Sequence, residues 1–148
     1  MINENLKLRG DVALVLRDKN GNIKDKREIK NLIVTSGLGF IASRMKNSTG
    51  IMSHMALGSS NTAAAAAQTA LLTQLGSREA LDSTTVSGAT VTYIASFEAG
   101  DGTGAVTEAG IFNAATSGTM LCRTVFGVVN KEADDTMSVT WTITLTAS

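Results

Sequence analysis

A strict alternation near the C-terminus constrains this chain most strongly. Residues 137–146 read Met-Ser-Val-Thr-Trp-Thr-Ile-Thr-Leu-Thr, so every odd-numbered position is apolar and every even-numbered one is Ser or Thr. A period of two is the repeat of a β-strand with one face on a core and the other in water. The alternation therefore predicts a long strand in an antiparallel sheet.

The N-terminal region shows the same period and predicts a β-hairpin over residues 6–34. Its apolar residues share one parity and its charged residues the other. Asn20-Gly21 follows the first half, and this dipeptide tolerates the positive φ angles of a tight hairpin turn. The apolar set is Leu6, Leu8, Val12, Leu14 and Leu16.

The rest of the chain is typical of short strands between turns. About eight strands joined by hairpin turns indicate an all-β fold, either an antiparallel β-sandwich or a jelly-roll-like arrangement, in a single domain over residues 1–148. Residues 77–86 are expected to form one of these strands. Two segments favour short helices: residues 36–45 and residues 61–75. In the second segment the helical pattern is strongest at residues 68–75, because the alanine run at residues 63–67 can equally serve as a connecting arm.

Charge is neutral overall but unevenly distributed. Thirteen basic residues balance thirteen acidic ones, which disfavours a general nucleic-acid binder. Residues 1–50 nevertheless carry a net charge of +5 and residues 51–148 a net charge of −5. Either the basic end docks on an acidic partner, or the hairpin simply has a solvated charged face.

Apolar runs are short. None approaches the roughly eighteen residues of a membrane-spanning helix, and the first residues do not resemble an export leader. We therefore expect a soluble protein with no membrane partner.

The residues whose side chains could act in catalysis or bind a metal do not combine into a catalytic or metal site. His54 has no carboxylate or Cys at metal-ligand spacing. Cys122 lies in an apolar strand, which is expected to raise the pKa of its thiol and make it less reactive. The glycines of residues 100–104 favour a turn over a phosphate loop. Glu98 and Glu108 could face each other like the carboxylates of a glycosidase, but aromatic residues for sugar stacking are scarce. We expect no catalysis, no cofactor and no metal.

A series of motifs over residues 51–146 resembles a class of small virion structural proteins of tailed bacteriophages. The ordered pattern is Leu-Gly, then Leu…Arg, then Thr-Glu-Ala-Gly-Ile-Phe, then Arg-Thr, and it is most specific at residues 107–113. In that class the pattern appears in capsid decoration (cement) proteins, with related versions in tail-fibre and baseplate proteins. The motifs stand here at residues 55–60, 71–81, 91–97, 107–113, 120–126 and the strand around Trp141.

The resemblance implies a non-catalytic β-sandwich that binds the outside of the assembled major-capsid shell and stabilises it. Such a protein assembles in the host cytoplasm, becomes part of the virion, and has the major capsid protein and its own copies, as a homodimer or homotrimer, as partners. The alternative is a tail-fibre or baseplate adaptor protein. We favour decoration because fibre proteins are usually longer and carry repeats.

Two groups of residues are candidates for these contacts. The basic residues of the hairpin are expected to meet an acidic region of the major capsid protein, and a group of apolar residues is expected to pack between protomers without being needed by the core. The capsid-facing candidates are Lys7, Arg9, Lys24, Lys26, Arg27 and Lys30, and the protomer-facing candidates are Ile51, Met52 and Met55.

Overall fold

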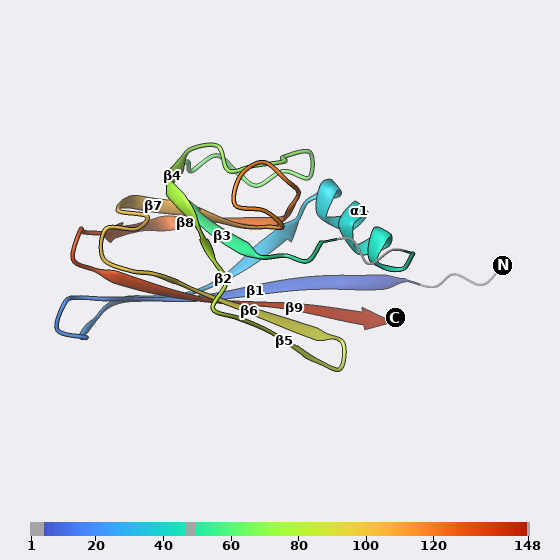
Figure 1. Cartoon of the computed structure of the whole chain (residues 1–148), viewed down its shortest axis with the longest axis horizontal. Helices are drawn as coiled ribbons and strands as arrows, with labels where there is room; N and C mark the ends of the chain where they lie inside the picture. Colours follow the sequence, from blue (N-terminus) through green and yellow to red (C-terminus); the bar gives the residue numbers. More distant parts are fainter. Residues whose placement is uncertain (1–4, 47–49, 148) are drawn as a thin grey trace.

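Nine antiparallel strands and one helix make up the fold in the computed structural model, which describes residues 5–46 and 50–147 (Figure 1). The strands form one sheet in the order β4-β3-β7-β8-β2-β1-β9-β6-β5. The all-β class expected from the sequence is confirmed. The elements are β1 (Leu6–Arg17), β2 (Ile23–Ile33), α1 (Thr35–Arg44), β3 (His54–Gly58), β4 (Gln74–Ala80), β5 (Ser83–Ser87), β6 (Thr90–Phe97), β7 (Gly104–Phe112), β8 (Met120–Lys131) and β9 (Thr136–Ala147).

The sheet curls into a half-barrel at β2. This strand pairs with β1 over most of its length but with β8 only at Leu32 and Ile33. The two parts of the sheet therefore separate beyond this short pairing, and β1, β9, β6 and β5 lie below β8, β7, β3 and β4 in Figure 1. One core fills the space between them, with buried residues from both parts.

The strand with the strictest alternation, β9, lies between β1 and β6 near the centre of one half. Its odd-numbered residues Met137, Val139, Trp141 and Ile143 are buried in the core. Its Ser and Thr side chains take the outer face, as the period of two predicts. The β1–β2 hairpin is also confirmed, with Gly21 at a φ of 84° in its turn.

The expected helix at residues 36–45 is confirmed as α1. Its Gly37 lies against β8 so closely that a Cβ atom there would overlap the carbonyl oxygen of Leu121. Ser36 Oγ donates to the carbonyl oxygen of Met120 at 3.0 Å. A glycine that weakens the isolated helix is thus what allows the helix to approach the sheet.

The second expected helix, at residues 61–75, is wrong, and the alanine run at residues 63–67 is part of a connection, the alternative that the sequence left open. The connection between β3 and β4, residues 59–73, instead crosses β7 and β8 on the side away from the main core; we call it the strap. Leu71 of the strap joins a second small core with Phe112 and Met120. Side chains bind part of its backbone: Glu108 accepts from the N–H groups of Leu72 and Thr73, which offsets part of the loss of helical hydrogen bonds.

The single strand expected at residues 77–86 is also wrong, because two strands occupy this region. β4 pairs with β3 in one half of the sheet, and β5 pairs with β6 in the other. The chain crosses between them at Leu81, whose N–H donates to the carbonyl oxygen of Ser53. As a result β4 and β5 are the two edge strands of the whole sheet.

Candidate interaction surface

The outer face of the β1–β2 hairpin gathers four of the six basic candidates. The antiparallel register puts Lys30 of β2 beside Asp11 of β1, and Lys26 beside Val15. Lys7 and Arg9 continue the same face along β1, since residues of one parity point the same way. All four are exposed. We call Lys7, Arg9, Lys26 and Lys30 the basic stripe.

Acidic side chains interrupt the stripe without neutralising it. Arg9 Nε lies 2.7 Å from Asp11 Oδ2, in an ion pair that leaves the Arg9 side chain 66% exposed. Glu28 stands opposite Ala13 on the same face. An exposed ion pair of this kind contributes little to stability, and this face keeps more basic than acidic side chains.

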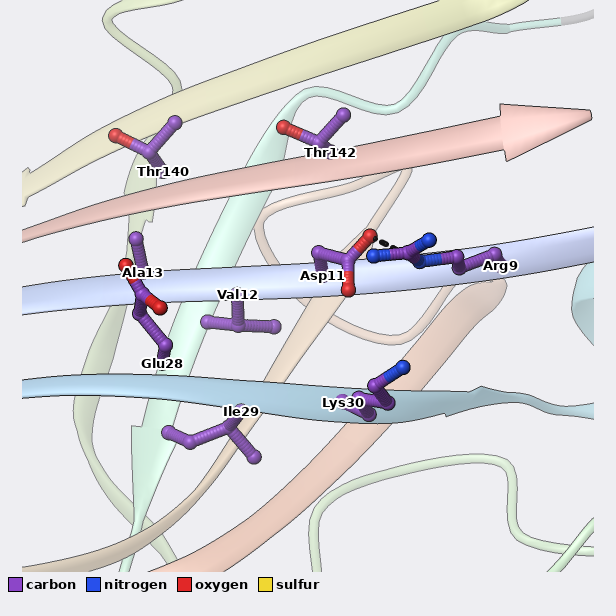
Figure 2. A pocket seen from close by; sticks show the side chains of 9 residues that line it. All are labelled: Arg9, Asp11, Val12, Ala13, Glu28, Ile29, Lys30, Thr140 and Thr142. Carbon is purple, nitrogen blue, oxygen red and sulfur yellow. Dashed lines mark ion pairs between the residues drawn. The ribbon is translucent and has the colours of Figure 1, made fainter.

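A shallow depression of about 570 Å³ lies across this face (Figure 2). Figure 2 shows charged side chains of β1 and β2 together with Thr140 and Thr142 of β9 around it. The depression therefore offers cationic, anionic and hydroxyl groups within one surface. Its lining comprises Arg9, Asp11, Val12, Ala13, Glu28, Ile29, Lys30, Thr140 and Thr142.

Hydroxyl side chains extend this face across β9 to β6. Cross-strand pairing places Thr142 beside Asp11 on one side and beside Thr92 on the other. Each hydroxyl can donate one hydrogen bond and accept others, so the surface can exchange hydrogen bonds with polar groups placed on it. We call the following set the hydroxyl field: Thr136, Ser138, Thr140, Thr142, Thr144 and Thr146 of β9, with Thr90, Thr92 and Ser96 of β6.

Lys24 does not belong to the basic stripe. Its Nζ lies 2.7 Å from Asp135 Oδ2 on the β8–β9 connection, and 3.6 Å from Glu132 Oε2. The hydrogen bond from Lys24 lowers the pKa of Asp135 below its ordinary 3.8, and the same bond raises the pKa of Lys24 above 10.5. Lys24 therefore links the β1–β2 hairpin to the β8–β9 connection of the same chain.

Arg27 has a similar internal role. It shares the parity of inward-facing residues, opposite Leu14, and pairs with Asp25. Its guanidinium donates to the carbonyl oxygens of Gly127 and Val128 in β8, where β2 and β8 no longer pair. Arg27 therefore bridges the opening between the two parts of the sheet.

The three protomer-facing candidates separate into buried and exposed residues. Met52 and Met55 are 2% and 0% exposed and belong to the main core, so the expectation that the core does not need them is wrong. Ile51 is 63% exposed. It lines an apolar groove of about 320 Å³ between α1 and β5, β6 and β9, with Phe40, Val86 and Ile143 among its other walls.

A buried ion pair that sequence reasoning missed lies under the strap. Arg123 Nη2 is 2.7 Å from Glu108 Oε2, and both side chains have 0% exposure. Arg123 also donates to the carbonyl oxygen of Thr62 and to Gln68 Oε1. The only signal in the sequence is that each charge stands alone among apolar and small neighbours. Glu108 is thus bound to Arg123 rather than paired with Glu98.

Four further titratable residues are held or buried by the fold: His54 and Cys122, which the sequence singled out, and Tyr93 and Lys131, which it did not. His54 Nδ1 lies 2.8 Å from the hydroxyl of its neighbour Ser53. Burial raises the pKa of the Cys122 thiol, and burial raises the pKa of Tyr93 to about 12. Lys131 Nζ donates to the carbonyl oxygen of Glu98, and burial lowers its pKa.

The glycine-rich segment that joins β6 to β7 forms a turn. Gly100 and Gly102 adopt φ angles of 89° and 61°, which a residue with a side chain rarely adopts. The N–H of Gly100 donates to the carbonyl oxygen of Ala133, which ties the turn to the β8–β9 connection.

Comparisons of the chain with protein-family models, curated proteins and solved structures find no match. In the parts of the chain that the structure describes, no three or more His, Cys, Asp or Glu side chains are grouped to hold a metal ion. Over the same residues, no helix has the length and hydrophobicity needed to cross a membrane.

Proposed function

We propose that this chain is a bacteriophage capsid decoration protein, which binds the outside of the assembled major-capsid shell and stabilises it without catalysis. The observation that carries the proposal is the basic stripe. Four exposed cationic side chains lie on one face of one hairpin, beside the hydroxyl field, and the motifs of residues 51–146 resemble such proteins.

The stripe suits an acidic surface on the major capsid protein. Exposed charge pairs each contribute up to about 1 kcal/mol, so four of them favour specific orientation and fast association more than high affinity. The hydroxyl field adds uncharged hydrogen-bonding groups around the stripe. A partner that binds only the assembled shell stabilises it by its binding free energy at every occupied site.

The arrangement of the buried charged groups supports a scaffold role. Glu108 and Arg123 hold the strap, Asp135 holds Lys24, and Lys131 holds the turn after β6 through the carbonyl oxygen of Glu98. Each of these groups links segments far apart in the chain. We infer that the two parts of the curled sheet act as the layers of a jelly-roll-like β-sandwich, a rigid body that displays the stripe.

The experiment is to add the purified chain to capsids of its own phage prepared without it, and to measure binding and the temperature of capsid rupture. Saturable binding with a raised rupture temperature is the expected result. Capsids that bind none of the added chain would contradict the proposal. Binding to isolated tails instead would favour the tail-fibre or baseplate alternative.

A further inference from the structure

The strand β5 ends the sheet and has β6 as its one strand neighbour in the described residues. All five of its residues, Ser83–Ser87, are exposed. The side of β5 that faces away from β6 therefore carries backbone N–H and C=O groups with no strand beside them. Such an edge is a template for pairing with another strand.

This edge lacks three features that commonly prevent strand pairing, namely charged side chains, Pro and a bulge. Residues 83–87 are Ser-Thr-Thr-Val-Ser, without charge or Pro, and they pair with β6 in an unbroken register. The opposite edge, β4, differs: it contains Arg78 and Glu79, and its register with β3 shifts at a bulge. Natural proteins protect edges with charges and bulges of this kind. The contrast within one molecule singles out β5.

We infer that β5 pairs antiparallel with β5 of a second copy of this chain, about a two-fold axis centred at Thr85. That register puts Ser83 opposite the partner's Ser87 and the two Thr85 residues opposite each other. A two-fold contact requires a surface that complements itself, and a neutral strand rich in β-branched residues does so without like-charge repulsion.

The apolar groove supports the choice of a second copy. Thr84 and Val86 of β5 line this groove, and Val86 is 69% exposed. In the proposed register each Val86 stands opposite the partner's Thr84, so pairing also shields apolar surface beside Ile51. Backbone pairing and burial of this surface thus favour the same contact.

The contact is expected to be weak in solution. One pair of five-residue strands buries less area than the roughly 1,200–2,000 Å² of a stable interface, which suggests a Kd in about the micromolar to millimolar range. On a surface that holds many copies, the high local concentration would strengthen it. The inference does not depend on the proposed function, because it concerns the isolated chain.

The experiment is sedimentation analysis of the full chain at rising concentration, with the variants Thr85→Lys and Thr85→Glu. Wild type is expected to dimerise, whereas each variant alone stays monomeric because two like charges then face each other. An equimolar mixture of the two variants is expected to recover the dimer. Ser77→Lys, an exposed position on β4, is the matched control and should dimerise like wild type.

Three results would overturn the inference. The first is a wild-type chain that stays monomeric up to concentrations of about 1 mM, the weak end of the expected Kd range. The second is Thr85→Lys dimerising like wild type. The third is loss of the dimer in Ser77→Lys but not in the Thr85 variants, which would place the contact on β4. Circular dichroism of each variant verifies that it is folded.

Discussion

Arg123 and Glu108 form an ion pair with no solvent exposure on either side chain, on the neighbouring strands β8 and β7. Glu108 accepts from the backbone of residues 72 and 73, and Arg123 donates to Thr62 and Gln68. The pair therefore binds the strap at both its beginning and its end. A charged pair, rather than apolar packing alone, fixes this long connection on the sheet.

Replacing Glu108 by Gln should destabilise the fold strongly. The change keeps the shape of the side chain but leaves the Arg123 charge buried and uncompensated, which costs about 3–5 kcal/mol. Urea denaturation measures this loss. Glu98→Gln, at an exposed position, is the control and should unfold like wild type. Equal stability of Glu108→Gln and wild type would show that the pair does not hold the strap.

The two glycines of α1 should respond in opposite ways to Ala. In Gly37→Ala the new methyl group meets the backbone of β8, so we expect a loss of about 1–3 kcal/mol. Gly39→Ala meets no atom within 4 Å, and its higher helix propensity should add about 0.5–1 kcal/mol. Thermal unfolding compares the two variants. A similar shift in both would mean that α1 does not approach β8 at Gly37.

Stability should fall in acid because of Asp135. Its pKa is lowered in the folded chain, mainly by the hydrogen bond from Lys24, so it binds protons more readily when unfolded. The stabilisation is present above the unfolded value of about 3.8 and is lost as the pH falls through the folded pKa. Asp135→Asn should be less stable at pH 7 and depend less on pH in this range. Denaturant titrations at several pH values check this, with the exposed Asp134→Asn as control.

Binding to the shell should depend on the basic stripe and on salt. Replacing Lys7, Arg9, Lys26 and Lys30 together by Gln should weaken capsid binding and reduce its dependence on ionic strength, because screening acts on these exposed charges. Glu28→Gln removes an acid from the same face and should strengthen binding. Co-sedimentation with capsids at several salt concentrations measures both effects. Unchanged binding of the fourfold variant would remove the charge argument from the proposal.

The elements with regular side-chain periods were predictable from the sequence. β9 and the β1–β2 hairpin are long enough for the alternation to be unambiguous, and the spacing of apolar residues predicted α1. The strap was not predictable in this way. An Ala-rich run followed by Leu71 and Leu72 has a helical pattern, but distant groups on Glu108 and Arg123 bind its backbone in an irregular path.

The candidate surface was predictable only in part. Parity along β1 and β2 separates Lys26 and Lys30 from Arg27, but assigning Arg27 to the core-facing side required the register between the strands. The partner of Lys24 lies 111 residues away in the sequence, so no local pattern could reveal it. The burial of Met52 and Met55 could not be predicted from alternation, because the region around β3 is buried on both faces.

The most direct measurement of the central claim is the number and position of copies of this chain in purified virions, by quantitative mass spectrometry and surface labelling of Lys7 and Lys30. The decoration proposal predicts as many copies as the shell has repeating binding sites, with free copies labelled at these lysines and capsid-bound copies protected. Copies confined to the tail, or a chain missing from the virion, would contradict it.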